Sequence, residues 1–291
     1  MPSLDNCSGI WYNYQKLYAD SEDDKMNESL NIMTLPYPDG RSKTVRVYVP
    51  AHEEGEKLPV VYMTDGQNLF EDDLPGQFGC WYTREAVRAE QESSSRAAII
   101  VGIHNDEGAI ERTNDLTPRS IGAVRFPSDL PKELEEGFEP KGEIFDSFVV
   151  EIVMPYVEEH YPVKKGRENT AFCGSSSGGL QAYFTALSHP DLFCISGVFS
   201  PAFVLYDSTD IISWTMNRLA DPAPYLYFYC GAGDPLEQEI FDSTEQVYDT
   251  LSELYPPEKL TEVLLPENPH NEKAWAPIFT DFLHTFLNRE L

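Results

Sequence analysis

The sequence has few basic residues. Its 291 residues include 21 lysines and arginines against 49 aspartates and glutamates, which gives a formal net charge of -28. Such a charge repels the phosphates of nucleic acids and of anionic lipids. We therefore expect neither a nucleic-acid partner nor a membrane partner. The charge is typical of a well-solvated surface, and adaptation to salt or a preference for neutral or cationic substrates are the alternatives.

Long apolar runs are also lacking. No stretch reaches the roughly 18 apolar residues that a membrane span requires. Residues 1–6 contain neither the basic nor the apolar part of a secretory signal, so the sequence as given favours a cytoplasmic protein. Residues 1–28 are polar and aromatic-rich and predict no clear structure. Residues 29–291 contain no repeat or Gly/Ser linker, so we expect them to form a single domain.

Cysteine is scarce and unpatterned. The five cysteines are odd in number and lack metal-ligand spacing, which argues against both a disulfide framework and a zinc site. Cys173, Cys194 and Cys230 lie in or beside apolar runs, as buried thiols in a reducing compartment would. Nothing in the sequence implies a metal or an organic cofactor.

Short apolar runs alternate with segments of helical period. The turn at 38–40 predicts an antiparallel hairpin between residues 32–35 and 44–49. Runs that are apolar at every position are typical of parallel strands buried on both faces; they cover residues 60–63, 98–101, 171–173, 195–199, 225–229 and 261–265. Helical period covers residues 81–92, 144–160, 177–188, 210–219, 237–254 and 274–287. This order predicts an α/β fold with a mainly parallel central sheet, an N-terminal antiparallel hairpin and helices on both faces. The active site of such a sheet lies at the carboxyl ends of its strands.

One of those strand ends contains three consecutive serines between glycines, at residues 174–178. Only Ser176 has glycine both two residues before and two residues after it. An apolar strand precedes it and a helix follows, which is the strand-turn-helix setting of the nucleophile of an α/β hydrolase. The glycines allow close approach of chain segments, and the helix N-terminus favours developing negative charge. A Gly/Ser-rich helix cap without chemistry is the alternative. In this context the segment predicts a serine hydrolase with Ser176 as nucleophile.

A serine nucleophile needs an imidazole base within hydrogen-bond reach. In α/β hydrolases the chain order is serine, acid, histidine. His270 lies in a loop after the last predicted strand and fits this order. His284 falls inside the final helix, where an ordinary partly exposed residue is expected. The remaining histidines precede the acid: His52, His104, His160 and His189.

The acid is expected just after the strand at 225–229. Asp234 is the first carboxylate off that strand, whereas Glu237 and Glu239 fall in the following helix. We therefore predict that Asp234 orients His270 and stabilises the imidazolium formed during attack.

The oxyanion hole requires two backbone N–H groups. One belongs to the residue after the nucleophile, Ser177. The other comes from the loop after an earlier strand, where Gly66 permits a tight reversal behind residues 60–63. This makes the amide of Gln67 the second predicted donor.

These segments together resemble the esterase D, or putative esterase, group of α/β hydrolases. That group includes feruloyl and acetylxylan esterases, ferric-enterobactin esterases, S-formylglutathione hydrolases and mycolyltransferases. The matching segments are residues 62–70, residues 101–105 with Arg112, residues 172–180 with 199–203, residues 230–234 and residues 270–275. The resemblance implies a triad of Ser176, Asp234 and His270, with the amides of Gln67 and Ser177 as oxyanion donors. The chain departs from the group at Ser177, where many relatives have Met, and at Asp234, where many have Glu.

The residues and the resemblance predict a carboxylic-ester hydrolase that works through an acyl-enzyme. Residues expected to line the substrate pocket are Asp65, Phe70, Trp81, His104, Arg112 and Trp275. The aromatic ones favour acyl esters of carbohydrate, of the feruloyl or acetyl kind. A siderophore-type lactone esterase is a less favoured alternative because its substrates are anionic, although Arg112 and Arg119 offer a local positive site. An acyltransferase and a non-catalytic binding module with a degenerate hydrolase fold remain further alternatives.

Overall fold

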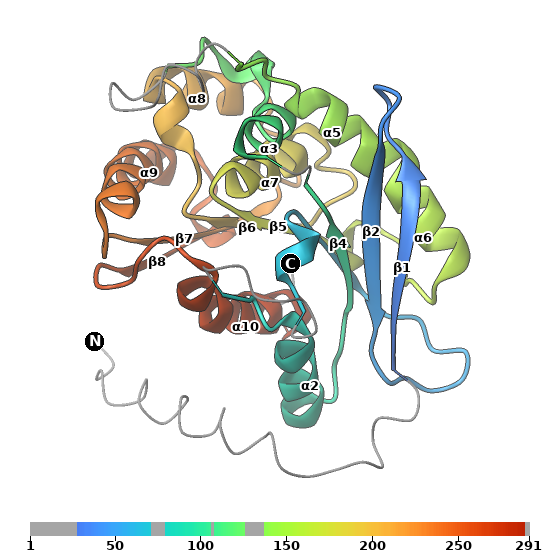
Figure 1. The fold of residues 1–291 in the computed structure, drawn as a ribbon. Coiled ribbons are helices and arrows are strands. Elements are labelled where there is room, and N and C mark those ends of the chain that lie inside the picture. The colour runs from blue at the N-terminus through green and yellow to red at the C-terminus, as the bar shows by residue number, and fades with distance from the viewer. Residues whose placement is uncertain (1–27, 71–78, 106–107, 126–136, 289–291) are drawn as a thin grey trace.

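The computed structural model describes residues 28–70, 79–105, 108–125 and 137–288 (Figure 1). Of the predicted N-terminal segment 1–28, only Glu28 lies within the described residues. Its carboxylate accepts hydrogen bonds from Tyr48 (2.8 Å) and Arg88. Glu28 therefore joins the start of the described chain to the strand and helix that hold these two residues.

Eight strands form one sheet in the order β1-β2-β4-β3-β5-β6-β7-β8 (Figure 1). The strands are β1 (Ser29–Pro36), β2 (Ser42–Val49), β3 (Val60–Met63), β4 (Ile99–Ile103), β5 (Thr170–Ser175), β6 (Ile195–Phe199), β7 (Tyr225–Gly231) and β8 (Leu260–Leu265). β1 pairs with β2, and β2 with β4, in antiparallel fashion. Every other pairing is parallel. The predicted mainly parallel sheet with an N-terminal antiparallel hairpin is confirmed.

The central strands are buried on both faces, as their unbroken apolar sequences predict. In β3, Val61 and Met63 face one hydrophobic core, whereas Val60 and Tyr62 face another. The first core contains side chains of α2 (Thr83–Ser94) and α10 (Glu272–Asn288). The second contains side chains of α5 (Gly142–Phe148), α6 (Met154–His160) and α7 (Ser177–Ser188). The sheet is therefore a middle layer between two helical layers (Figure 1).

A third apolar cluster extends the second helical layer over β6 and β7. It joins α7 to α8 (Ser208–Met216) and α9 (Pro235–Leu254). The helix predicted over residues 144–160 is present but contains a π-helical turn, Val149–Val153, between α5 and α6. Pro155 follows that turn, and proline lacks the N–H of a regular helical bond. The short helix α3 (Ala109–Asp115) was not predicted, because it lacks a long periodic pattern.

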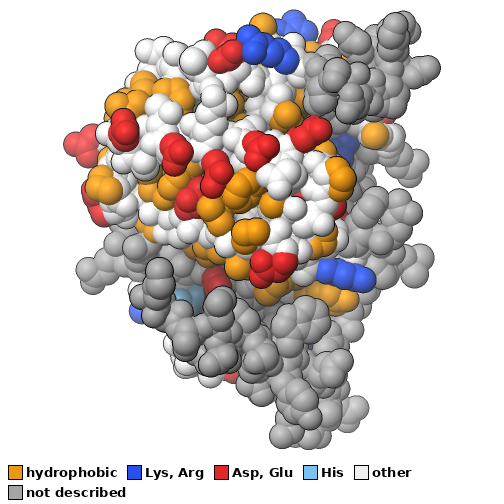
Figure 2. Space-filling view, turned by 90° about the vertical axis from the view of Figure 1, so that its left-hand side faces the viewer, with side chains coloured by type: hydrophobic (Ala, Val, Ile, Leu, Met, Phe, Trp, Pro, Cys, Tyr) orange, Lys and Arg blue, Asp and Glu red, His pale blue; other side chains and the backbone are white. Residues whose placement is uncertain are grey.

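The acidic surface and the buried cysteines agree with what the composition predicts. On the face formed by α9 and β8, acidic side chains lie scattered among apolar ones and few basic ones are visible (Figure 2). Cys80, Cys173, Cys194 and Cys230 are buried free thiols, so the burial predicted for the last three is confirmed; Cys7 lies outside the described residues. Among the described helices, none is both long and apolar enough to cross a bilayer.

Candidate active site

Ser176 lies at a sharp turn between β5 and α7. Its backbone has φ 58° and ψ −127°, a conformation that residues with a Cβ rarely adopt. Strain of this kind persists only where the surrounding structure holds it, and it is typical of the nucleophile turn of hydrolases. The Ser176 N–H donates to the carbonyl of Phe199 (3.0 Å), and its carbonyl accepts from Ala202 (3.0 Å). The turn is thereby fixed to the end of β6.

The two glycines of the motif are required by close packing. A Cβ on Gly174 would clash with the carbonyl of Gly178, and a Cβ on Gly178 would clash with the Thr64 side chain. Thr64 follows β3, the neighbour of β5, and its N–H donates to the carbonyl of Cys173 (3.3 Å). The turn around Ser176 therefore packs directly against the loop that follows β3.

The ends of four neighbouring parallel strands bring the other candidates to the same edge. Ser175 pairs in register with Phe199, and Gly231 pairs with Leu265. The loop after β8 holds His270, whose imidazole Nδ1 is hydrogen-bonded to the carboxylate of Glu237. The Glu237 side chain is fully buried, and that of His270 is 11% exposed. Among the described residues, no hydrogen bond joins Ser176 Oγ to this imidazole.

The structure corrects the prediction that Asp234 orients the imidazole of His270. Asp234 is the N-cap of α9, where its Oδ1 accepts from the Glu237 N–H (2.9 Å). Its Oδ2 accepts from the backbone N–H of His270 (2.7 Å), not from the ring. Both oxygens are thus engaged by backbone groups. The ring carboxylate is Glu237, one helical turn further on.

Asp234 keeps a well-defined place beside the site. Partial burial alone would raise the pKa of Asp234, but the hydrogen bonds from the Glu237 and His270 N–H groups and the nearby imidazole outweigh it, so the pKa is lowered. Asp234 is therefore an anion that holds the histidine loop against α9.

The sequence did contain a signal for this arrangement. Asp234 precedes Pro235 and stands three residues before Glu237. An acidic N-cap, proline at the first helical position and glutamate at the third mark a helix start. That pattern commits Asp234 to capping and places Glu237 in the first turn of α9, directed back toward the end of β7.

The predicted oxyanion donors lie on two adjoining helix starts. Ser177 is the first residue of α7, and Gln67 lies in the short 3-10 helix Gly66–Asn68 after β3. The first N–H groups of a helix have no acceptor within it, so both amides are available to an external oxygen. The Gln67 side chain is engaged elsewhere, because its Nε2 donates to Asn105 Oδ1 (2.8 Å).

An ion pair between the buried Asp65 and the partly exposed Arg112 supports this loop. Arg112 binds both oxygens of Asp65 at 2.7 and 2.8 Å, and Asn105 also donates to that carboxylate. Burial would raise the pKa of Asp65, but the charge of Arg112 and hydrogen bonds from Arg112, Thr64 and Asn105 outweigh it, so the pKa is lowered. Arg112 also reaches the carbonyl of Ser175 at 3.4 Å. Asp65 and Arg112, predicted as pocket residues, neutralise each other beside the turn of Ser176.

The predicted aromatic pocket residues are buried rather than open to substrate. Phe70, Trp81 and Trp275 are 0%, 2% and 4% exposed. The rings of Trp81 and Trp275 are stacked with centroids 5.6 Å apart, and Trp81 also stacks on Phe199 at 5.5 Å. All three belong to the hydrophobic core beside α2 and α10, and the ring of Trp275 also meets that of His270. Their burial gives no support to the predicted aromatic mouth.

His104 follows β4 and lies beside β2, where its backbone N–H donates to the carbonyl of Thr44 (3.0 Å). Burial, together with the positive charge of Arg46, lowers the pKa of His104 to about 4. It is therefore neutral at pH 7. No hydrogen bond within the described residues joins it to Ser176 or to His270.

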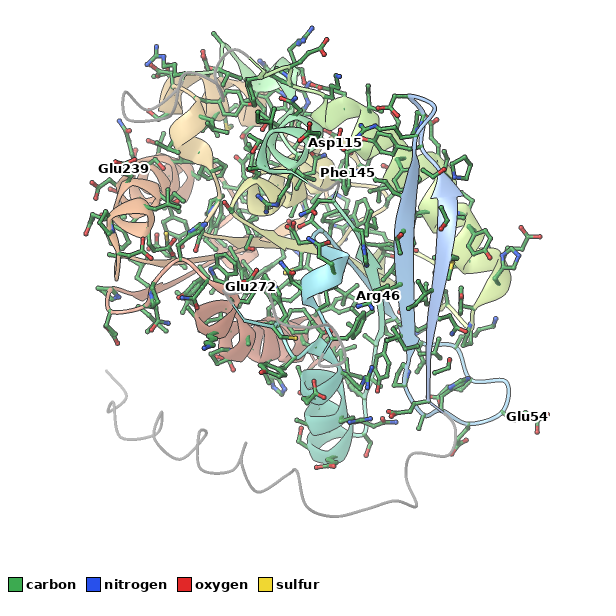
Figure 3. All side chains as sticks on the ribbon, viewed as in Figure 1. Arg46, Glu54, Asp115, Phe145, Glu239 and Glu272 are labelled. Atoms are coloured by element: carbon green, nitrogen blue, oxygen red, sulfur yellow. The ribbon has the colours of Figure 1, made fainter. Side chains whose placement is uncertain are left out.

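Sequence reasoning did not single out Glu272, the first residue of α10. Its carboxylate accepts from Asn68 Nδ2 (2.9 Å), which ties the oxyanion loop to the helix behind His270. Burial and the nearby carboxylate of Asp65 raise the pKa of Glu272. Figure 3 shows it at the end of α10 near the centre of the molecule, whereas Glu239 lies at the outer side of α9.

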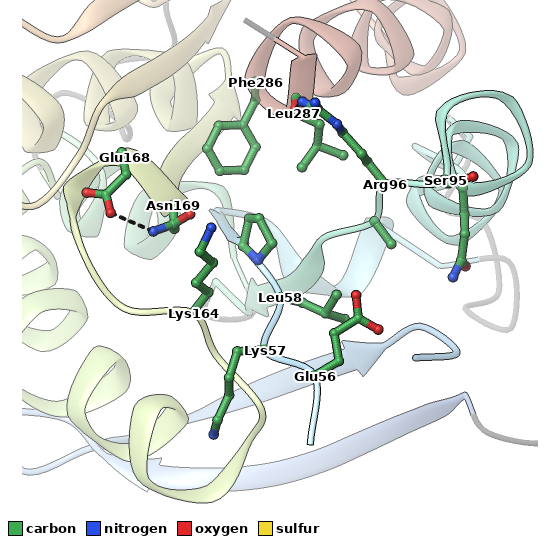
Figure 4. A pocket seen from close by; sticks show the side chains of 13 residues that line it. Glu56, Lys57, Leu58, Ser95, Arg96, Lys164, Glu168, Asn169, Phe286 and Leu287 are labelled. Carbon is green, nitrogen blue, oxygen red and sulfur yellow. Dashed lines mark hydrogen bonds between the residues drawn. The ribbon is translucent and has the colours of Figure 1, made fainter. Parts of the chain in front are cut away.

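A hollow of about 380 Å³ lies elsewhere, at the amino ends of β3, β4 and β5 (Figure 4). Its lining includes Pro59 and Asn169, which directly precede β3 and β5, and Ala97, two residues before β4. Since Ser176 follows the carboxyl end of β5, this hollow is at the opposite edge of the sheet. It has no part in the candidate active site.

Comparison with known proteins identifies the family. A family model described as "Putative esterase" matches residues 39–226, which is more than half of the chain. The chain belongs to the Putative esterase family. The resemblance inferred from the motifs is thereby confirmed, and the chain is assigned to the serine hydrolases of this family.

Two curated relatives of comparable similarity differ in length. The chain is 21% identical over 201 residues to the endo-1,4-beta-xylanase/feruloyl esterase of Xylanibacter ruminicola, a match that covers 67% of this chain but 23% of that protein. It is also 21% identical over 201 residues to the protein YbbA of Bacillus subtilis, covering 67% of this chain and 72% of YbbA. The esterase-family chain thus spans about a quarter of the first relative.

Solved structures similar to this esterase-family chain share its architecture. An IroE-like serine hydrolase from Shewanella oneidensis has a TM-score of 0.70 at 18% identity, covering 89% of this chain and 80% of that one. Siderophore hydrolase EstB from Aspergillus nidulans has 0.66 at 20% identity, with 89% and 95% covered. The ferulic acid esterase AmCE1/Fae1A from Anaeromyces mucronatus has 0.61 at 22% identity, with 92% and 94% covered. The predicted α/β-hydrolase fold is confirmed.

Proposed function

We propose that this protein is a serine carboxylic-ester hydrolase with a catalytic triad of Ser176, His270 and Glu237. The observation that carries the proposal is the meeting of two features at one sheet edge. Ser176 is held at a strained turn, and His270 is bound through Nδ1 by a fully buried carboxylate. A carboxylate on Nδ1 leaves Nε2 as the basic nitrogen, which is the tautomer that a serine nucleophile needs.

The reaction follows from this geometry. Ser176 Oγ attacks the ester carbonyl while His270 Nε2 takes its proton, and the resulting oxyanion accepts from the N–H groups of Gln67 and Ser177. His270 then protonates the departing alkoxide, which leaves an acyl group on Ser176. Water activated by the same imidazole releases the acid. The Glu237 carboxylate stabilises the imidazolium in both steps.

For the substrate we propose acyl esters of carbohydrate, of the feruloyl or acetyl kind. The buried aromatic residues no longer support this choice. Its support is the relative named as a xylanase/feruloyl esterase and the charge of -28, which disfavours anionic substrates such as siderophores. Siderophore esterases nevertheless occur among the structural neighbours, so a siderophore-type lactone remains the second candidate.

The experiment has two arms. A fluorophosphonate probe should label the wild type and Ser175→Ala but not Ser176→Ala, and a folded wild type that is not labelled would instead favour a binding module. Feruloylated and acetylated xylo-oligosaccharides should release free acid faster than nitrophenyl acetate is hydrolysed. No turnover above that on nitrophenyl acetate would refute the proposed substrate, and transfer of the acyl group to an added alcohol in preference to water would show an acyltransferase.

A further inference from the structure

The carboxylate of Glu237 has a second set of partners behind the imidazole. Its Oε1 accepts from Ser200 Oγ (2.6 Å) and from the N–H of Gly231 (2.8 Å), while Oε2 faces His270. Ser200 is fully buried at the end of β6. It has φ 40°, a strained value for a residue with a side chain, and its N–H donates to the carbonyl of Tyr229 (2.7 Å). The surrounding structure therefore fixes the backbone of Ser200 at the end of β6.

Trp275 fixes which way the Ser200 hydroxyl donates. The indole Nε1, which can only donate, gives its proton to Ser200 Oγ at 3.0 Å. The serine oxygen thus acts as acceptor toward the indole, and its own proton is directed to Glu237. Trp275 Nε1, Ser200 Oγ and Glu237 Oε1 form a one-way chain of hydrogen bonds that ends on the carboxylate.

Trp275 also contacts the base at the other end of the chain. Its ring meets the imidazole of His270 edge-on, with centroids 5.0 Å apart and planes at 88°. The indole is itself held by stacking on Trp81. His270, Glu237, Ser200 and Trp275 therefore form a closed ring of contacts in which the same indole supports both the base and its carboxylate.

We propose that Ser200 and Trp275 are positioning residues that set the orientation and basicity of the Glu237–His270 pair. This inference rests on the proposed esterase function of the same site. By occupying Oε1, the Ser200 hydroxyl leaves Oε2 as the atom that meets the imidazole. A carboxylate that accepts more hydrogen bonds is a weaker base, and it stabilises an adjacent imidazolium less. Ser200 thus fixes which carboxylate oxygen faces the ring, and its loss is expected to change the pH dependence of the reaction.

Other charged groups around the pair are accounted for. Asp234, at the start of α9, accepts from the His270 backbone, and Glu272, on α10, is engaged by Asn68. The thiol of Cys230, on β7, lies 3.8 Å from Glu237 Oε1, and burial raises its pKa so that it remains neutral. None of these groups changes in the variants below.

The test compares two variants with two matched controls. Ser200→Ala removes the hydroxyl, and Trp275→Phe removes the indole N–H but retains an aromatic ring against His270. Ser196 and Trp214 are equally buried, at 0% and 4%, and their Oγ and Nε1 make no hydrogen bond to any residue in the described part of the chain. Ser196→Ala and Trp214→Phe therefore repeat the same substitutions where no chain of hydrogen bonds is lost.

The readouts are the pH profile of kcat/KM on nitrophenyl acetate and the NMR signal of the proton between His270 and Glu237. Ser200→Ala should lower kcat about tenfold with little change in KM, because the carboxylate is then no longer held with Oε2 toward the imidazole. The acid limb of its profile should move to higher pH by about half a unit. Trp275→Phe should give a smaller shift in the same direction. Added to Ser200→Ala, it should give no further shift, because both act through one hydroxyl.

The outcomes separate this inference from the proposed function. If Ser200→Ala and Trp275→Phe lose thermal stability but keep the kcat, pH profile and NMR signal of their controls, the two residues are merely structural and the inference is wrong. If the wild type hydrolyses no ester but Ser200→Ala still shifts the His270 proton signal, the proposed function fails and the inference stands.

Discussion

Replacement of Glu237 by glutamine tests the carboxylate that the structure places on His270. The Gly231 N–H and the Ser200 hydroxyl both donate to the Oε1 position. They will therefore hold the amide oxygen of the new glutamine there and direct its NH₂ group at His270 Nδ1. Because NH₂ is a donor, Nδ1 must become the acceptor and the proton must move to Nε2. An imidazole in that tautomer cannot accept the proton of Ser176.

The expected loss is large because Glu237 is fully buried and, among the residues that the structure describes, no other carboxylate is hydrogen-bonded to the ring. An amide in place of the triad carboxylate lowers kcat by roughly 10⁴-fold in serine proteases. We expect a loss of about 10³- to 10⁴-fold here, equivalent to about 4–5.5 kcal/mol of transition-state stabilisation. The assay is steady-state hydrolysis of nitrophenyl acetate at pH 8, with circular dichroism to confirm folding.

Two control variants make this prediction sharp. Asp234→Asn keeps a good N-cap but loses the acceptor for the His270 N–H, so we expect a loss of about 1 kcal/mol in stability and less than tenfold in kcat. Glu239→Gln, at an exposed position on the same helix, should leave both unchanged. A folded Glu237→Gln enzyme that retains a tenth of the wild-type kcat, or a greater loss in Asp234→Asn, would refute the assignment of Glu237.

Three further predictions concern the loop, the oxyanion donor and the edge strand. Gly66→Ala should destabilise the fold by about 1–3 kcal/mol in urea denaturation, because a Cβ there lies 2.6 Å from the carbonyl oxygen of Gly102; an unchanged midpoint would contradict this. Ser177→Ala should keep kcat within about twofold, since the backbone N–H is the donor, and a hundredfold loss would assign a role to its hydroxyl. Burial raises the pKa of Glu262 to about 7, so its ionisation destabilises the fold as pH rises from 4.5 through 7. Glu262→Gln should therefore raise Tm by about 2 °C at pH 8 but not at pH 4, a small effect because solvent screens this half-buried group; equal shifts at both pH values would count against it.

The strands and the nucleophile turn were predictable because their causes are local. The apolar run at β5 and the glycines around Ser176 encode a buried strand and a close approach, whatever the rest of the chain does. Chain order left His270 and His284 as candidates for the base, and the loop position of His270 after the last strand decided between them. For the strand and the turn, the residues that form the sequence pattern are also the residues that cause the structure.

Chain order could not show which carboxylate meets His270, because the two candidates, Asp234 and Glu237, are only three residues apart. Asp234 and Glu237 both follow β7, and helix geometry decides which of them turns back to the imidazole. The sequence pattern around Asp234 indicates its N-cap role. The donors that hold Glu237, Ser200 and Gly231, come from the ends of two different strands, and no local pattern indicates that they meet. Such a convergence depends on tertiary structure.

The burial of Trp275 could have been predicted from the spacing of aromatic residues in its helix. Trp275 lies on the same face of α10 as Phe279, Phe282 and Phe286, since these residues are separated by four, three and four positions. That spacing is typical of a core-facing stripe. The fully buried Phe70, by contrast, directly precedes residues outside the described structure, and its burial was not evident from a helical or strand pattern.

The central claim is that Ser176 forms an acyl-enzyme, and rapid mixing with nitrophenyl acetate followed by mass spectrometry tests it most directly. The account predicts a burst of one equivalent of nitrophenol and a single acetyl group, which peptide sequencing places on Ser176. An acetyl group on Ser175 or Ser177, or ester turnover with neither a burst nor a covalent adduct under acid quench, would contradict it.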